Sequence, residues 1–177
     1  MNNHNESIAR TVHWAFAAYV IIMMILGFYM ANSSYNLDIY RLHKSLGTVF
    51  FALVTIRLYT WIKHPWRSSS KGTKTERLVK AAHSALLILM IAMPVTGFLS
   101  SAFSGFSVHI FDFIIVPEHY SVSGEIVPFN STVYEAAKLL HRLFAYALAA
   151  LVTLHTLAAL KHHFINKDDT LKRMMNT

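Results

Sequence analysis

Between positions 141 and 163 the chain reads HRLFAYALAALVTLHTLAALKHH. Residues 143–160 are uncharged, and about 20 apolar residues are enough to cross the hydrocarbon core of a bilayer as a helix. His141 and His155 lie fourteen residues apart, which on an α-helix returns to nearly the same face about 21 Å further along the axis. One face of this predicted helix therefore presents two imidazoles, one near each membrane surface.

Three further apolar stretches precede this one, so we predict four spans at residues 12–31, 45–62, 81–103 and 139–162. The first is uncharged, the second contains only Arg57, and the third contains Pro94 and Gly97, which membrane helices tolerate. Only 14% of the residues are charged, against about 25% in a typical soluble domain. We therefore expect an all-α integral membrane protein, with residues 1–177 forming a single membrane domain built as a four-helix bundle.

A long loop, residues 104–135, separates the third span from the fourth. Its apolar part, Phe106 to Pro117, is short and contains His109 and Asp112, which favours an interfacial segment over a fifth crossing. Thr132 followed by Glu135 fits a capping box, which predicts that the last helix begins near Val133.

The distribution of Lys and Arg predicts the topology, because cytoplasmic loops carry the excess. One side holds eleven of the sixteen: Arg10, Lys63, Arg67, Lys71, Lys74, Arg77, Lys80, Lys161, Lys167, Lys172 and Arg173. The other side holds only Arg41, Lys44, Lys138 and Arg142. We therefore expect both termini in the cytoplasm. The net charge of +7 follows mostly from this asymmetry, so we expect no nucleic-acid partner.

The spacing of fourteen recurs on the other predicted helices, and the antiparallel spans sort these positions into two layers. The layer near the cytoplasm contains His13, Arg57, His83 and His155; the outer layer contains Gly27, His43, Gly97 and His141. Such a pattern suits two haems stacked across a bilayer, each held by two imidazoles. His43 and His141 form the outer pair, and the two glycines allow a flat macrocycle to approach the backbone.

The inner layer has three histidines for two axial positions. His155 takes one because it shares a helix face with His141, and spacing alone leaves the other to His13 or His83. Arg57 is a charge within a span, which is costly without a partner, and a haem propionate or an anionic quinone would provide one.

The chain contains no cysteine. This excludes disulfides, thiolate zinc sites, iron–sulfur clusters and covalent attachment of haem. Any haem is therefore expected to be type b, held without a covalent bond.

Several stretches resemble the prokaryotic cytochrome b-561 family, which is related to the cytochrome b subunits of nickel–iron hydrogenases. They are His13-Trp14, the residues 42–47 (LHKSLG), the residues 94–97 (PVTG) and the tail from Lys161 to Met174. The resemblance implies a four-helix bundle in the bacterial inner membrane that encloses two b-type haems. It places the inner haem iron between His13 and His155, the outer iron between His43 and His141, and His83 beside the inner haem.

The resemblance also implies electron transfer with ubiquinone at the inner end and, in certain members, oxidation of superoxide at the outer end. Arg41 and Lys44 flank His43, and Lys138 and Arg142 flank His141, so the outer cations gather at the predicted ligands. These cations suit an anionic donor such as superoxide, or instead pair with propionates and lipid headgroups.

For the quinone, His162 lies two helical turns beyond His155 and, with His83 and Arg57, forms the predicted site. The leading interpretation is a quinone-linked oxidoreductase that receives electrons from superoxide or a redox protein. Two alternatives remain. One is a membrane-anchor cytochrome b subunit of a larger dehydrogenase or hydrogenase, and the other is a histidine-lined metal or proton transporter.

Overall fold

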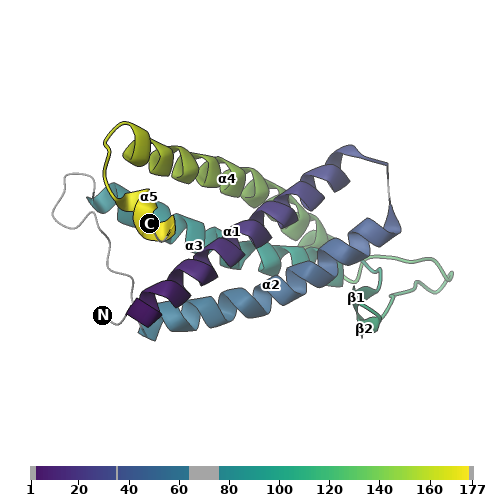
Figure 1. The fold of residues 1–177 in the computed structure, drawn as a ribbon. Helices are drawn as coiled ribbons and strands as arrows, with labels where there is room; N and C mark the ends of the chain where they lie inside the picture. The colour runs from purple at the N-terminus through teal and green to yellow at the C-terminus, as the bar shows by residue number, and fades with distance from the viewer. Residues whose placement is uncertain (1–2, 35, 64–75, 176–177) are drawn as a thin grey trace.

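The structure of the chain is a computed structural model that describes residues 3–34, 36–63 and 76–175; a few side chains inside these ranges, that of Arg57 among them, lie outside the description. Four long helices form an elongated bundle (Figure 1): α1 Asn3–Asn32, α2 Leu37–Lys63, α3 Glu76–Ala102 and α4 Ser131–Phe164. A short helix, α5 Thr170–Met175, follows them. The predicted four-helix architecture matches these elements, and α3 continues through Pro94.

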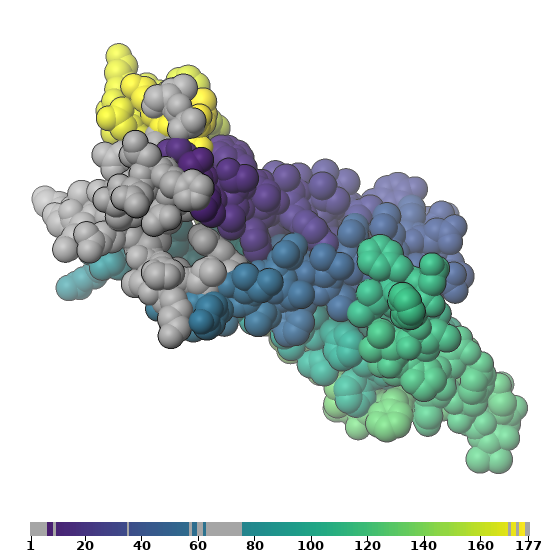
Figure 2. Space-filling view, turned by 60° about the horizontal axis from the view of Figure 1, so that its bottom comes forward, coloured from purple at the N-terminus to yellow at the C-terminus, as the bar shows by residue number. Residues whose placement is uncertain are grey.

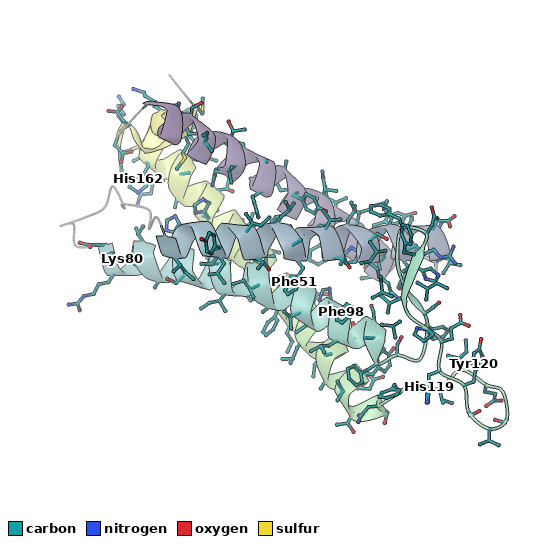
Figure 3. All side chains as sticks on the ribbon, turned by 90° about the horizontal axis from the view of Figure 1, so that it is seen from below. Phe51, Lys80, Phe98, His119, Tyr120 and His162 are labelled. Carbon is teal, nitrogen blue, oxygen red and sulfur yellow. The ribbon has the colours of Figure 1, made fainter. Side chains whose placement is uncertain are left out.

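Three helices of the described part, α1, α3 and α4, are long and apolar enough to cross a membrane. Their surfaces expose large apolar side chains; Phe98 on α3, labelled in Figure 3, is 43% exposed. Because a bilayer is itself apolar, this exposure is what a lipid-facing surface requires. Phe51 on α2 is also 43% exposed, although α2 is not one of these three helices.

A small core holds the four helices together near the middle of the bundle. Val20 of α1, Phe50 and Val54 of α2 and Leu148 of α4 are buried against one another. Tyr19 stacks on Phe50 with 5.2 Å between ring centroids, and its hydroxyl donates to the carbonyl of Leu46 at 2.8 Å. Close packing of such side chains fixes the relative rotation of the helices, and hence the face that each one presents to the bundle interior.

The first and last helices meet at one end of the bundle, which we call the terminal end (Figure 1). Trp14 of α1 donates from Nε1 to the carbonyl of Met174 in α5 at 2.8 Å. This contact places the start of α1 and the end of the chain on the same side, as the predicted topology requires.

The opposite end, which we call the loop end, holds a β-hairpin that the sequence did not predict. Strand β1 Val108–Ile110 pairs antiparallel with β2 Phe113–Val116, and β1 packs against α2. The apolar segment from Phe106 to Pro117 is therefore not an irregular stretch but a hairpin. Further along, Gly105 has φ +88 and a Cβ there would lie 2.1 Å from the carbonyl oxygen of Val127, so the loop closes only around glycine.

The predicted start of the last helix is wrong by two residues. Helix α4 begins at Ser131, and Asn130 is its N-cap, because its side chain accepts from the backbone N–H of Val133. The helix therefore already begins before Thr132, with Asn130 rather than Thr132 accepting from one of its first backbone N–H groups. In the same way Asn36 accepts from the backbone N–H groups of Asp38 and Ile39 at the start of α2.

Candidate functional site

The bundle brings the predicted histidines together in two groups, one at each end. At the loop end, the rings of His43 on α2 and His141 on α4 have centroids 6.3 Å apart, with an interplanar angle of 87°. At the terminal end, the rings of His13 on α1 and His155 on α4 also have centroids 6.3 Å apart, with an angle of 54°. Helix α4 contributes one ring to each pair, which is the arrangement that the fourteen-residue spacing predicted.

Two imidazoles on opposite sides of one metal have a defined separation. The metal–nitrogen bond is about 2 Å and the ring centre lies about 1 Å beyond the nitrogen, so the two centroids are about 6 Å apart. Both pairs have this separation. The ring of His83 on α3 instead lies 5.4 Å from that of His155, and its Nδ1 is 2.7 Å from the carbonyl of Val79 in its own helix. The distances therefore favour His13 over His83 as the partner of His155.

Two glycines adjoin the pair at the loop end. A Cβ on Gly97 would lie 3.0 Å from Cε1 of His141, and a Cβ on Gly27 would lie 3.5 Å from Cε1 of His43. The four residues predicted as the outer layer thus meet in one place. Glycine at position 97 is needed for its lack of a side chain, because a Cβ would press on the imidazole.

The ring of His141 is held by a hydrogen bond that sequence reasoning missed. Its Nδ1 is 3.0 Å from the carbonyl oxygen of Met93 and 3.2 Å from Oγ1 of Thr96, a buried residue. The Thr96 hydroxyl donates to the carbonyl of Ala92 at 2.8 Å. Because a carbonyl only accepts, Nδ1 of His141 carries the proton and Nε2 has a free lone pair.

The ring of His43 is held differently. Its Nδ1 is buried and has no hydrogen-bond partner among the described residues. Burying such a nitrogen without a hydrogen bond or another bonding partner lowers the stability of the folded state. The two rings of this pair therefore differ: the backbone of α3 orients His141, whereas no described residue orients His43 by a hydrogen bond to Nδ1.

Cations predicted to surround His43 and His141 fall into two environments. Arg41 lines a pocket of about 400 Å³ with six residues of the loop: Ser107, His109, Ile114, Pro117, Glu118 and Tyr120. Lys138 contacts the ring and hydroxyl of Tyr134 and lies 3.9 Å from Glu135. Arg142 is exposed and Lys44 partly buried. Arg41 is thus the cation beside a cavity that a small solute can enter.

In that pocket the hydroxyl of Tyr120 donates to Glu118 Oε2, and Ser107 donates to Oε1 of the same carboxylate at 3.3 Å. The hydrogen bond to Glu118 and the charge of this carboxylate raise the pKa of Tyr120 above its usual value of 10.0. Tyr120 is therefore a neutral donor at physiological pH, and Glu118 lines the same pocket as Arg41.

The predicted quinone residues are only partly brought together (Figure 3). His162 lies at the terminal end near Lys80, and its Nδ1 is 2.5 Å from Oδ2 of Asp168 in the turn after α4. Lys80 pairs with Glu76 at 2.6 Å. The side chain of Arg57 lies outside the described residues, so its predicted partner is not tested. Asp168, which orients His162, was not singled out from the sequence, although it lies in the quoted tail.

Comparison with known proteins identifies the family of the chain. The chain belongs to the family described as prokaryotic cytochrome b561, which matches residues 4–177. It is 33% identical to cytochrome b561 homolog 2 of Escherichia coli (strain K12) over 95% of this chain and 89% of that protein. It is 32% identical to cytochrome b561 homolog 1 of the same organism, over 93% and 92% of the two chains.

A further relative is the probable superoxide oxidase CybB of Yersinia pestis, 28% identical over 93% of this chain and 91% of that protein. Membership of the family makes the chain a membrane protein and implies b-type haem and membrane electron transfer. The resemblance drawn from residues 42–47, 94–97 and the tail is confirmed at the level of the family.

The histidine pairs fit a b-type haem by their own geometry. Each has the separation expected of two imidazoles that would share one metal, His141 offers an unprotonated Nε2, and His43 has a buried nitrogen without a hydrogen-bond partner among the described residues. Among the residues that the structure describes, no group of three or more His, Asp or Glu side chains is arranged to hold a metal ion by itself. Pairs of imidazoles suit a metal whose remaining ligands come from a macrocycle.

Proposed function

We propose that this protein is a dihaem b-type cytochrome that moves electrons across the bacterial inner membrane to ubiquinone, with superoxide as its donor at the outer face. The observation that carries the proposal is the equal 6.3 Å separation of the two histidine pairs, joined by a single helix, α4. His13 and His155 hold the inner haem, and His43 and His141 the outer one. Both termini lie in the cytoplasm, so the loop end faces outward.

Haem bound between each pair of imidazoles would supply one-electron transfer chemistry. The chain's own residues set the rest. The carbonyl of Met93 and the hydroxyl of Thr96 fix the tautomer of His141, and Gly97 keeps the space beside its ring free. The 21 Å rise between His141 and His155 sets the two sites near opposite membrane surfaces.

At the outer face, Arg41 gives the pocket at the loop end a positive group for a small anion. The outer loops contain four cations and five carboxylates, so attraction is local rather than global. Two superoxide anions that each lose one electron leave as two molecules of oxygen, and the two electrons reduce one ubiquinone. Support for superoxide comes from the relative named as a probable superoxide oxidase.

At the inner face, reduction of ubiquinone consumes two protons. When both ring nitrogens of His162 carry protons, Nδ1 donates to Asp168 and Nε2 can donate to a carbonyl oxygen of the quinone and pass it that proton. His83 lies beside His155 and can orient the same headgroup. Arg57 is kept in the proposed site as a partner for a propionate or for the anionic quinone.

Four alanine variants test the ligand assignment, with haem counted per purified chain. His43→Ala and His141→Ala are each expected to lose one haem and to abolish reduction from the outer face. His13→Ala should lose the other haem, whereas His83→Ala, the matched control in the same layer, should keep both. Two haems retained in His43→Ala, or a loss in His83→Ala without one in His13→Ala, would contradict the assignment.

A further inference from the structure

The hairpin at the loop end contributes His109 and Ile114 to the wall of the Arg41 pocket, and most of its exposed side chains are apolar. Phe111 is 56% exposed, Phe113 75% and Ile114 63%. Strand β2 reads FIIV, without a polar residue on either face. A strand with one face in water alternates apolar and polar residues, so this strand is not built for water on one side and protein on the other.

A tertiary hydrogen bond sets the level of the hairpin along the bundle. The backbone N–H of Phe111 donates to Oγ of Ser45 at 2.8 Å, and both Ser45 and Val108 are almost fully buried where β1 meets α2. Ser45 is the first residue of the apolar stretch 45–62, so the hairpin is held at the boundary of the hydrocarbon core. Figure 2 shows its segment, in green, standing against α2 at this end of the molecule.

The turn of the hairpin holds the backbone of an aromatic residue in an unfavourable conformation. Ile110 pairs with Phe113, so Phe111 and Asp112 form a two-residue turn, and Phe111 has φ +53. Such turns favour glycine, asparagine or aspartate, because positive φ costs a residue with a Cβ about 1 kcal/mol. The backbone N–H at this position donates to Oγ of Ser45, and the Phe111 side chain is largely exposed.

We propose that the β1–β2 hairpin is an interfacial lipid anchor that inserts Phe111, Phe113 and Ile114 among the acyl chains beside the loop end of the bundle. The free edges of a two-stranded sheet need hydrogen bonds from water, so the hairpin lies in the headgroup region rather than in the hydrocarbon core. Asp112 at its tip remains in the headgroup layer. The occupant is lipid because Ser45, which holds the hairpin, begins the expected span 45–62, so that the exposed apolar side chains of the hairpin lie at the level of the acyl chains.

The absence of cysteine makes a direct test possible. Two single-cysteine variants, Ile114→Cys and Phe113→Cys, are each labelled with a nitroxide. The full-length protein is then studied in phosphatidylcholine vesicles. The matched control is Val122→Cys, at a fully exposed position in the same loop. Paramagnetic resonance then compares label collisions with oxygen, which partitions into lipid, and with a water-soluble nickel chelate. Unchanged helical circular dichroism verifies that each variant is folded.

The depth parameter is the logarithm of the ratio of oxygen collisions to nickel-chelate collisions. The proposal predicts a positive value at positions 113 and 114, where oxygen collisions dominate, and a negative value at position 122. Nickel collisions at 113 and 114 equal to those at 122 would show that the hairpin stands in water and would overturn it. Labels at 113 and 114 that are immobile and shielded from both reagents would also overturn it, because a protein surface then covers the hairpin. If such labels become mobile when each vesicle contains fewer protein chains, the covering surface belongs to a second copy of this protein.

Discussion

Gly97→Ala is the smallest change that reaches the proposed outer ligand. The new Cβ would lie 3.0 Å from Cε1 of His141 and 3.3 Å from its Nδ1, whereas ordinary contact begins at 3.4 Å. The imidazole must therefore retreat by about 0.4 Å, and metal–ligand distances tolerate only about 0.2 Å. We expect Gly97→Ala to lose the outer haem, or to bind it with a changed midpoint potential, and to retain the inner haem unaltered.

The assay is haem extraction and counting per chain, followed by potentiometric titration of the visible spectrum. Gly27→Ala is the matched control, because its Cβ meets Cε1 of His43 at an ordinary 3.5 Å. Alanine stabilises a helix by about 1 kcal/mol relative to glycine, so neither variant should weaken the fold. A Gly97→Ala protein with the parent's haem content and both parental potentials would refute the reasoning.

Three further outcomes are expected. Thr96→Val removes one of two acceptors near Nδ1 of His141. This change should raise the midpoint potential of the outer haem by at most about 40 mV, which for one electron corresponds to about 1 kcal/mol. Thr96→Ser should restore the potential, and redox titration of the three proteins measures it. Asn130→Ala removes the N-cap of α4 and should lower the free energy of unfolding by about 1 kcal/mol in denaturant titrations, whereas an unchanged midpoint would show that water caps the helix equally well. Tyr120 should ionise above pH 10.0 in ultraviolet difference titrations against Tyr120→Phe, because ionisation breaks its hydrogen bond to Glu118. This bond stabilises the folded state below pH 10.0, and the stabilisation is lost as the pH rises through the raised pKa of Tyr120. Ionisation of Tyr120 at its usual pKa in the unsubstituted protein would disprove the contact.

The sequence predicts the helices and the histidine layers because both depend on periodicity within one element. The fourteen-residue interval between His141 and His155 is a property of α4 alone, and the long apolar stretches reveal where the helices lie. The same reasoning left His13 and His83 open, because their choice depends on the rotation of α1 and α3 about α4. The structure supplies that rotation through the core around Phe50 and Leu148.

The features that escaped prediction all join residues far apart in the chain or compete locally for the same backbone group. Met93 and Thr96 reach His141 across 48 and 45 residues, and Ser45 reaches Phe111 across 66. No periodicity encodes such contacts. Asn130 was missed for a local reason, since two nearby side chains can each cap the helix and the one two residues before Thr132 is the N-cap.

Two haems per chain are the central claim, and a reduced-minus-oxidised visible spectrum of the purified protein, combined with haem extraction and counting, tests it most directly. The account predicts a b-type spectrum, two haems per chain and complete release into acidified organic solvent, because the chain has no cysteine to attach them. A colourless protein, or one haem per chain in fully loaded preparations, would contradict it.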